Sequence, residues 1–587
     1  MNQPTPAIVA QSAVRRLPRI ALLLLCAVYL LPGLVGRGPW KSADITAFGY
    51  MAELAQSAAS LAHWLNPTLL GMPAEIPGPL PYWIGALVIR AVPGWVDPDL
   101  AVRAIFALLL GLTFTATWFA TYYLARMPQA QSVAFAFGGE ARPKDYARAI
   151  GDGGLLALIA CLGLAQLGHE TTPALAQLFF CANLFYGVSA LPYHRRIMPR
   201  IGCTVGVVGM ALSGAPAMSL ALGAGATLLA AVERGLRQRA ERAAAQNVYA
   251  PVHNLGPTYS SAAILWLAGS TALAAVLAAA LGLLQWHVTL LGTGHASLFV
   301  NVRNWIKLLI WFTWPVWPLA LWTLWRWRRH LGQRHVALPL WFVAVPLAAT
   351  LTTSFADRSL LLALPALAVL AAFALPTFRR SAAALVDWFT LLFFSGAAVF
   401  IWAYWIAMQT GIPPRMAASV PRLLPGYVPS LSWTALLLAL AATLAWGWLV
   451  RWRTGHNRPA LWKTLVLPAG GAALCWALLM TLWLSALNYA RSYAPQVQAV
   501  IEHVGQPVCV NELALSPAHV AALRFHGGLN LVALDTDKKC PWLLVTPVVI
   551  TQLHDIINLE YWRLIGTLRR PASDTDDLLL YQYTGPK

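Results

Sequence analysis

Apolar runs of about 20 residues, long enough to cross a bilayer as a helix, recur along most of this 587-residue chain. The chain is 58% hydrophobic and only 11% charged, and it holds 27 tryptophans, which excludes a soluble enzyme. It is therefore predicted to be a polytopic α-helical membrane protein with about thirteen transmembrane helices. The predicted spans cover roughly residues 17–36, 100–126, 151–167, 172–193, 200–213, 216–232, 258–285, 304–325, 337–354, 359–377, 382–407, 432–450 and 464–487.

The net charge of +19 has a distribution that argues against a nucleic-acid partner. With the N-terminus inside, 24 of the 41 lysines and arginines fall in cytoplasmic segments, against nine in the opposite loops before residue 488. The positive-inside rule then gives a cytoplasmic N-terminus. This count treats residues 79–93 as an interfacial helix. An alternative interpretation of residues 1–36 is a cleaved signal peptide.

The final 100 residues change character, because short β-like runs alternate with turns or helical stretches. We predict a transmembrane domain over residues 1–487, with a first outward loop over 37–99, and a small outward α/β domain over 488–587. Five of the seven cysteines lie in apolar spans and are interpreted as core residues. Cys509 and Cys540 flank predicted strands in an oxidising compartment, so we expect a disulfide between them.

Acidic residues in the first outward loop need an explanation, since charges beside a bilayer are costly. Asp44, Glu53 and Glu75 lie in this loop, and their presence indicates catalysis on a lipid-linked substrate. The chain has no Walker loop, no dinucleotide glycine fingerprint and no zinc-spaced Cys/His cluster. His287 and His295 are the nearest candidates for a metal pair, and we interpret them as polar loop residues. No cofactor is expected, although the sequence leaves a divalent-metal requirement open.

Several short segments follow one another in a defined order. They are Asp44 in the first loop, Glu75 before Pro79-Leu-Pro-Tyr82-Trp83, Ala101-Val-Arg103 at the start of the next span, Trp314-Pro-Val-Trp317, and Ser354-Phe-Ala-Asp-Arg358 running on to Pro365. In order and spacing the chain resembles the ArnT and protein O-mannosyltransferase group of GT-C membrane glycosyltransferases. Enzymes of this group use polyprenyl-phosphate sugars, and the resemblance covers nearly the whole chain.

The chain also departs from this family in its motifs. It has Asp44-Ile-Thr-Ala-Phe48 where aminoarabinose transferases have Asp-Glu-x-x-Tyr, and Ile76 where they have lysine. Gly214-Ala-Pro216 stands in place of Lys-Gly-Pro, and a loop acid is found at Glu170, slightly out of register. These departures concern the sugar and the acceptor more than the reaction class.

The resemblance implies displacement at an anomeric carbon with a lipid phosphate as the leaving group, which requires neighbouring cations. Arg358 is the first candidate, and Arg303 and Lys307 are helpers; Arg358 could instead pair with Asp357 or reach the headgroups. Asp44 would act as a general base or orient the acceptor, and its alternative role is a helix N-cap.

Other candidates have weaker support from the sequence. Glu75 and Glu170 are further catalytic candidates or solvated interfacial acids, and Glu53 is expected to point to water. The remaining candidate substrate-binding residues are Tyr82, Trp83 and Arg103, for which an aromatic belt and snorkelling are the alternatives.

The predicted function is an inverting glycosyltransferase of the bacterial inner membrane with an active site on the periplasmic side. Its partners would be a polyprenyl-phosphate sugar donor, membrane lipids, and an envelope acceptor such as lipid A, lipopolysaccharide or another glycan. A protein O-mannosyltransferase-like activity is one alternative. A lipid-linked-sugar transporter is another, although no internal repeat is evident. An inactive scaffold is a third.

Overall fold

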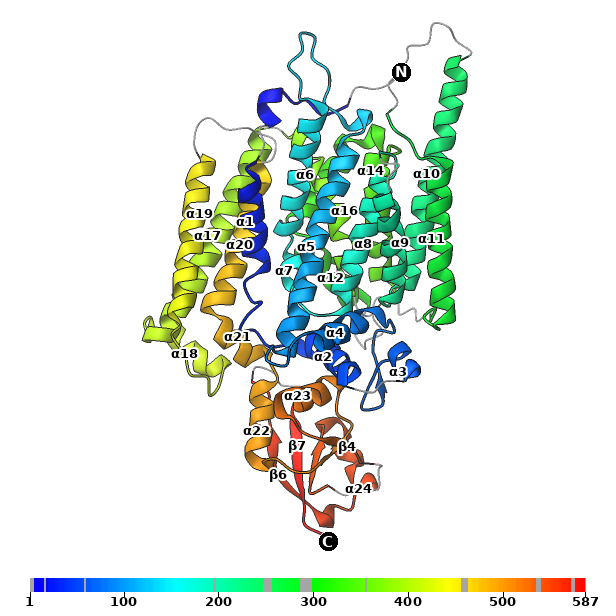
Figure 1. Ribbon diagram of the computed structural model, residues 1–587. Helices are drawn as coiled ribbons and strands as arrows, with labels where there is room; N and C mark the ends of the chain where they lie inside the picture. Colours follow the sequence, from blue (N-terminus) through cyan, green and yellow to red (C-terminus); the bar gives the residue numbers. More distant parts are fainter. Residues whose placement is uncertain are drawn as a thin grey trace.

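The computed structural model describes residues 5–14, 17–56, 60–193, 197–245, 256–285, 298–353, 356–378, 380–454, 463–534, 540–571 and 576–585. Long helices run side by side in a bundle, and a small domain with a β-sheet extends from one end of it (Figure 1). We call this the C-domain end of the bundle. The first described residues lie at the opposite end.

Each of the predicted spans overlaps one or two helices of the bundle. Within the described residues, eight helices are long and apolar enough to cross a membrane, or nine if the bent pair α12 and α13 counts as one span. The prediction of a polytopic helical membrane protein is confirmed. The bundle consists of α1 (Arg19–Leu30), α5 (Pro98–Ala125), α6 (Pro143–Ala160), α7 (Leu162–Leu167), α8 (Pro173–Ala190), α9 (Ile197–Leu212), α10 (Pro216–Ala245), α11 (Ser261–Ala280), α12 (Leu298–Phe312), α13 (Val316–Arg326), α14 (Arg334–Thr350), α15 (Ala356–Leu361), α16 (Leu364–Ala372), α17 (Arg380–Thr410), α19 (Trp433–Thr454) and α20 (Lys463–Leu482).

Some predicted spans are interrupted rather than continuous. The span predicted over 304–325 bends by 88° between α12 and α13, where Pro315 offers no backbone N–H to continue the helix. The span predicted over 151–167 breaks at Cys161, between α6 and α7. The two breaks meet, because the N–H of Leu162 donates to the carbonyl of Trp314 at 3.0 Å. The first predicted span is also shorter than expected, since α1 ends at Leu30.

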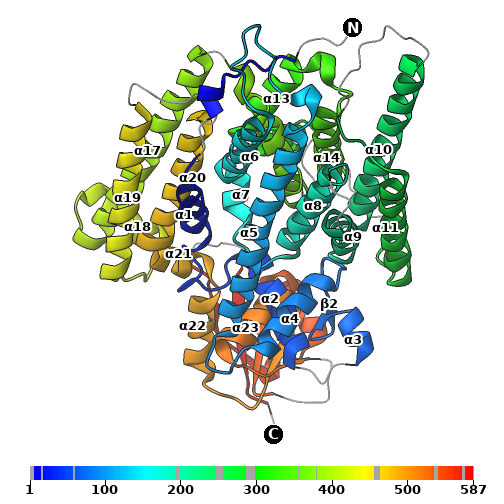
Figure 2. The same cartoon turned by 45° about the horizontal axis from the view of Figure 1, so that its top comes forward.

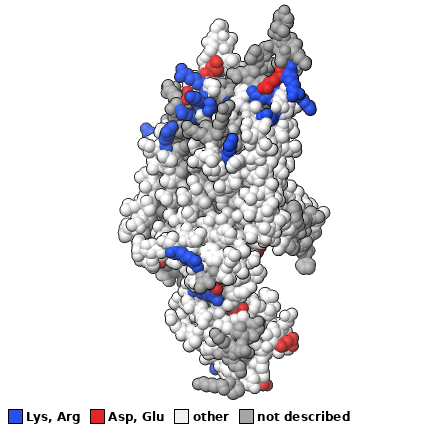
Figure 3. Space-filling model, turned by 45° about the vertical axis from the view of Figure 1, so that its right-hand side comes forward, with Lys and Arg blue, Asp and Glu red and all other residues white. Residues whose placement is uncertain are grey.

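Basic side chains are distributed unevenly between the two ends of the bundle. Figure 3 shows most of the visible lysines and arginines at the end opposite the C-terminal domain. This agrees with the segregation of basic residues in the sequence. The orientation in the membrane stays a prediction.

The C-terminal domain is built on a five-stranded sheet of order β4-β3-β5-β7-β6. Strand β3 is parallel to β4 and β5, whereas β7 is antiparallel to β5 and β6. Strands β5 and β7 are buried at consecutive rather than alternating positions, so both faces of the sheet are covered at its centre. The elements are α22 (Ala494–Val504), β3 (Val510–Leu513), α23 (Pro517–Gly527), β4 (Leu531–Ala533), β5 (Trp542–Val545), α24 (Leu553–Ile556), β6 (Trp562–Leu568) and β7 (Leu578–Tyr583).

A disulfide joins Cys509 to Cys540 across 31 residues, with 5.4 Å between their Cα atoms. Closing a loop of this length should stabilise the C-terminal domain by about 3–4 kcal/mol through the entropy of the unfolded chain. We expect Cys509→Ser/Cys540→Ser to lower the unfolding temperature of the domain, measured by limited proteolysis during a temperature ramp. An identical cleavage profile with and without the disulfide would contradict this. Cys161→Ser is the control, since its thiol is free.

The first loop forms short elements between the bundle and the C-terminal domain (Figures 1 and 2). They are α2 (Lys41–Gln56), α3 (Leu61–Leu65), β1 (Thr68–Leu69), β2 (Met72–Pro73) and α4 (Leu80–Ala91). Helix α4 lies at the C-domain end and packs on α2, where a Cβ at Gly85 would be 2.3 Å from the sulfur of Met51. Residues 79–93, predicted to be an interfacial helix, thus contain the helix α4, which packs on α2 at the C-domain end of the bundle.

Helix α2 also packs against α23 of the C-terminal domain. A Cβ at Gly49 would be 2.4 Å from the Cβ of Ala521, so only glycine permits this approach. Phe48 packs edge-on against Phe525, with 4.6 Å between the ring centroids. Glu53 forms an ion pair with Arg524. The expectation that Glu53 points to water is wrong, because its carboxylate pairs with Arg524 of the C-terminal domain, 471 residues later in the chain.

Candidate active site

Asp44 lies in the first turn of α2 and is completely buried. One carboxylate oxygen accepts the N–H of Thr171 at 2.8 Å and its hydroxyl at 2.5 Å. The other accepts the N–H of Trp40 at 2.9 Å and the guanidinium of Arg37 at 3.1 Å. Four donors therefore occupy the two carboxylate oxygens of Asp44. The carboxylate ties the first loop to the segment between α7 and α8.

Glu170 lies beside this carboxylate and pairs with Lys41, with 2.5 Å between Nζ and Oε1. Only 8% of the Glu170 side chain is exposed, against 32% of the Lys41 side chain. Burial raises the pKa of Glu170, while Lys41 lowers it and the nearby charge of Asp44 raises it, with a net shift above the ordinary value. Lys41 opens α2 at a φ of +54°, a conformation uncommon outside glycine. The pair thus combines a buried carboxylate of raised pKa with a cation whose side chain is one-third exposed.

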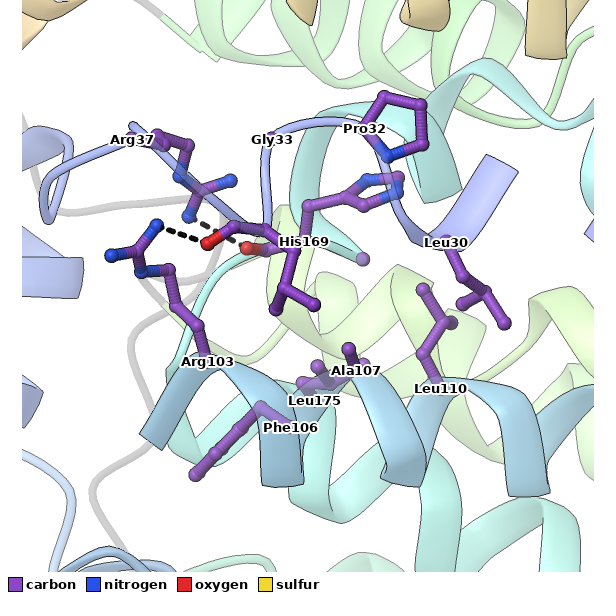
Figure 4. Close-up of a pocket in the computed structure, with 12 residues that line it drawn as sticks. Leu30, Pro32, Gly33, Arg37, Arg103, Phe106, Ala107, Leu110, His169 and Leu175 are labelled. Atoms are coloured by element: carbon purple, nitrogen blue, oxygen red, sulfur yellow. Dashed lines mark hydrogen bonds between the residues drawn. The ribbon is translucent and has the colours of Figure 1, made fainter. Parts of the chain in front are cut away.

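Arg37, Lys41, Asp44, Glu170 and Thr171 form what we call the acid–base cluster. Arg37 is buried and also donates to the carbonyl of His169 at 2.7 Å (Figure 4). His169 in turn stacks on Trp476 of α20, with 3.8 Å between ring centroids. The cluster is thus held by three distant parts of the chain.

Arg103 forms the rim of a small cavity next to the cluster (Figure 4). Its guanidinium pairs with Asp99 at 2.6 Å and donates to the carbonyl of Leu34 at 2.6 Å. The cavity measures about 20 Å³, room for a single water molecule. In this structure Arg103 fixes the start of α5 to the loop after α1, and substrate binding by Arg103 stays a prediction.

A second group of predicted site residues meets between α4 and α15. Tyr82 is buried on α4, and its pKa is raised by burial, then by Tyr50 and Glu75, and lowered by Arg358. The exposed carboxylate of Glu75 and the half-buried Arg358 therefore both lie within electrostatic range of the Tyr82 hydroxyl. Gly78, next to this group, packs on the backbone of Gly214, from which a Cβ would be only 2.2 Å away. The Glu75 segment therefore docks on the Gly214-Ala-Pro216 turn.

Other predicted residues lie apart from these groups. Arg303 and Lys307 are exposed on α12. The indole N–H of Trp83 donates to the carbonyl of Trp64 at 2.6 Å, so Trp83 connects two segments of the first loop. His287 and His295 lie outside the described residues. Among the residues that the structure describes, no group of three or more His, Cys, Asp and Glu could hold a metal ion.

Sequence reasoning missed Arg37, Lys41 and Thr171 as members of the cluster. Arg37 and Lys41 carried a signal, because they precede Asp44 by seven and three residues in the same loop. For Thr171, the only sequence signal was its position next to Glu170. The pairing of Lys41 with Glu170 joins residues 129 positions apart and has no local sequence pattern.

The comparison with solved structures identifies the fold, whereas the sequence comparisons find no match. No family model matches the sequence, and no curated protein sequence does either. The structure is similar to that of ArnT from Cupriavidus metallidurans bound to undecaprenyl phosphate, with a TM-score of 0.60 at 13% identity over 97% of this chain and 99% of ArnT. The apo state of the same ArnT matches with a TM-score of 0.58 at 12% identity over the same shares of the two chains. The chain therefore has the ArnT fold over nearly its whole length.

Proposed function

We propose that this protein is a membrane glycosyltransferase that moves a sugar from a polyprenyl phosphate to an acceptor of the cell envelope. The observation that carries the proposal is the Lys41–Glu170 pair beside Asp44, on the first loop of a chain with the ArnT fold. A bound undecaprenyl phosphate in one of the similar ArnT structures supports a lipid phosphate as the carrier of the sugar.

The reaction is a single displacement. An acceptor hydroxyl oxygen attacks the anomeric carbon while the bond from that carbon to the phosphate oxygen breaks. The polyprenyl phosphate leaves with the electron pair, and the proton of the hydroxyl passes to a carboxylate. Attack opposite the leaving group inverts the anomeric configuration.

We assign the proton to Glu170 rather than to Asp44. The Asp44 carboxylate is buried and already accepts four hydrogen bonds, whereas Glu170 has a raised pKa and a partner that is one-third exposed. Asp44 then acts as a positioning residue that holds Thr171, and with it Glu170. Glu75 is the second candidate for the base, since its carboxylate is exposed.

The leaving phosphate needs positive charge, which Lys41 and Arg358 would supply. Lys41 lies on α2 at the C-domain end of the bundle, and Arg358 lies within electrostatic range of Tyr82 on α4 at the same end (Figure 1). We assign this end to the periplasm and the protein to the bacterial inner membrane. The gathering of basic residues at the opposite end supports that assignment (Figure 3).

The experiment that tests the proposal is a mass-spectrometric comparison of envelope lipids and glycans from cells with the parent protein and with Glu170→Gln. A sugar-sized mass present only with the parent is expected, and it would name both the sugar and the acceptor. Identical envelopes, with lipid-linked sugar still bound to the purified parent, would instead indicate a scaffold.

We expect Arg358→Ala to weaken binding of undecaprenyl phosphate by about tenfold, because a charge-assisted hydrogen bond to phosphate is lost. The affinity would be measured by native mass spectrometry of the purified protein. Arg422→Ala is the matched control, since Arg422 is exposed on α18 (Pro414–Leu423). Equal affinity in the Arg358 variant and the parent would make Arg358 structural only.

A further inference from the structure

A cavity of about 590 Å³ opens beside the acid–base cluster, and neither the fold comparison nor the proposed mechanism uses it. We call it the lateral cavity. It lies between α21 (Leu484–Arg491), α22, and the loop that joins α18 to α19. Figures 1 and 2 show α18, α21 and α22 on the same side of the molecule, where the bundle meets the C-terminal domain. The cavity is large enough for a sugar unit or two rather than for water alone.

Its lining is polar and aromatic without formal charge. The side chains that bear on the argument are Tyr427, Ser485, Asn488, Tyr489, Gln498 and His526, and none of the described lining residues is Lys, Arg, Asp or Glu. Burial lowers the pKa of His526, so its ring is neutral at pH 7. A phosphate bound here would lack the charge-assisted hydrogen bonds from Arg or Lys that phosphate sites commonly use. Hydroxyl, amide and imidazole groups are instead the partners that sugar hydroxyls use.

The two tyrosine rings are held as a fixed wall. Tyr489 donates its hydroxyl to the carbonyl of Pro425 at 2.6 Å, and the hydroxyl of Tyr427 bonds to that of Ser485 at 2.5 Å. The ring centroids are 5.5 Å apart. Aromatic faces fixed in this way offer an apolar surface to the C–H face of a sugar ring, while the polar groups around them meet its hydroxyls.

The lateral cavity is joined to the acid–base cluster by the first loop. The Oδ1 atom of Asn488 accepts the indole N–H of Trp40 at 2.7 Å, and its amide donates to the carbonyl of Gly36 at 2.6 Å. The backbone N–H of the same Trp40 donates to Asp44. Gly38, between these residues, lines the cavity. One short stretch of chain thus forms both the cavity wall and the support of the cluster.

From this arrangement we infer that the lateral cavity is the acceptor subsite and that it binds an uncharged glycan, not a phosphate group. The inference rests on the proposed function and narrows it, because the proposed function leaves the charge of the acceptor open. An uncharged glycan reacts through a hydroxyl, as the proposed displacement requires, and a hydroxyl nucleophile needs a base whereas a phosphate does not.

The test uses the full-length protein in nanodiscs, since maltoside detergents carry sugar headgroups. Envelope oligosaccharides released by mild acid are split by anion exchange into a neutral and a phosphorylated fraction. Binding of each fraction is measured by saturation-transfer NMR. We expect the neutral fraction to bind the parent, and Gln498→Ala and Tyr489→Leu to weaken that binding by about tenfold. Gln498 is exposed, so its replacement should leave the fold intact. The exposed Gln552 on the C-terminal domain provides the matched control Gln552→Ala.

Tighter binding of the phosphorylated fraction, or neutral binding that neither variant changes, would overturn the inference. So would a cavity that takes up only lipid from the nanodisc. Transfer kinetics then separate this inference from the proposed function. An acceptor KM raised in both variants at unchanged donor affinity supports the subsite. Transfer with unchanged acceptor KM refutes the subsite alone, whereas neutral glycan binding without any transfer by the parent refutes the proposed function alone.

Discussion

Replacing Glu170 with glutamine is expected to slow sugar transfer by at least about 100-fold, the usual contribution of a general base. Glutamine still offers an oxygen to Lys41, so undecaprenyl-phosphate affinity and thermal stability should stay close to those of the parent. The rate would be measured in proteoliposomes with a polyprenyl-phosphate sugar, and the affinity by native mass spectrometry. The loss should therefore appear in kcat rather than in donor binding.

The pH dependence gives a second readout of the same residue. Burial raises the pKa of Glu170, and the carboxylate form is the one that takes a proton. The parent rate should therefore fall as the pH drops through that raised pKa, at a higher pH than an ordinary glutamate would show. The residual rate of Glu170→Gln should lack this acidic limb. If the variant kept both the limb and the parent rate, Glu170 would not be the base.

Replacing Asp44 with asparagine is expected to reduce transfer by about 100-fold, because Glu170 loses its fixed position, and also to destabilise the protein. The variant leaves the guanidinium of Arg37 buried beside a neutral amide, since the two side chains are only 3% and 1% exposed. Breaking a buried ion pair from one side costs about 3–5 kcal/mol. Thermal unfolding followed by intrinsic fluorescence measures the second effect.

A double variant separates the two effects of Asp44. Arg37→Gln/Asp44→Asn removes both charges, so it should recover much of the lost stability without recovering transfer. Glu53→Gln is the matched control on the same helix, because its ion pair with Arg524 is partly exposed and contributes less than about 1 kcal/mol. Unchanged turnover in Asp44→Asn would remove Asp44 from the mechanism.

The sequence was sufficient for features that depend on local pattern. Apolar runs predicted the helices of the bundle, and the positions of arginines predicted which end gathers positive charge. Asp44 could be selected because an acid beside an apolar span needs a reason. The pairing of Cys509 with Cys540, proposed from their flanking strands, matches the disulfide in the structure.

Features that depend on contacts between distant segments could not be predicted in this way. The Lys41–Glu170 and Glu53–Arg524 pairs join residues from separate elements, so no spacing rule reveals them. The hydrogen bonds from Thr171 and Trp40 to Asp44 could not be predicted either, and they are the reason for proposing that Asp44 positions other residues rather than reacts. No proline marks the helix break at Cys161. The carbonyl of Trp314, which accepts the N–H of Leu162 at this break, lies in another span.

The packing of α2 against α23 determines at what stage of protein synthesis the acid–base cluster can reach its final structure. Helix α2 carries Lys41 and Asp44 of the acid–base cluster, and a ribosome makes it several hundred residues before α23. Through Gly49, Phe48 and Glu53, α2 reaches its final surroundings only after residues 517–527 have been synthesised. A nascent or truncated chain would thus contain every residue of the cluster yet lack the support on one face of its helix. Synthesis of α23 is therefore a precondition for the finished site.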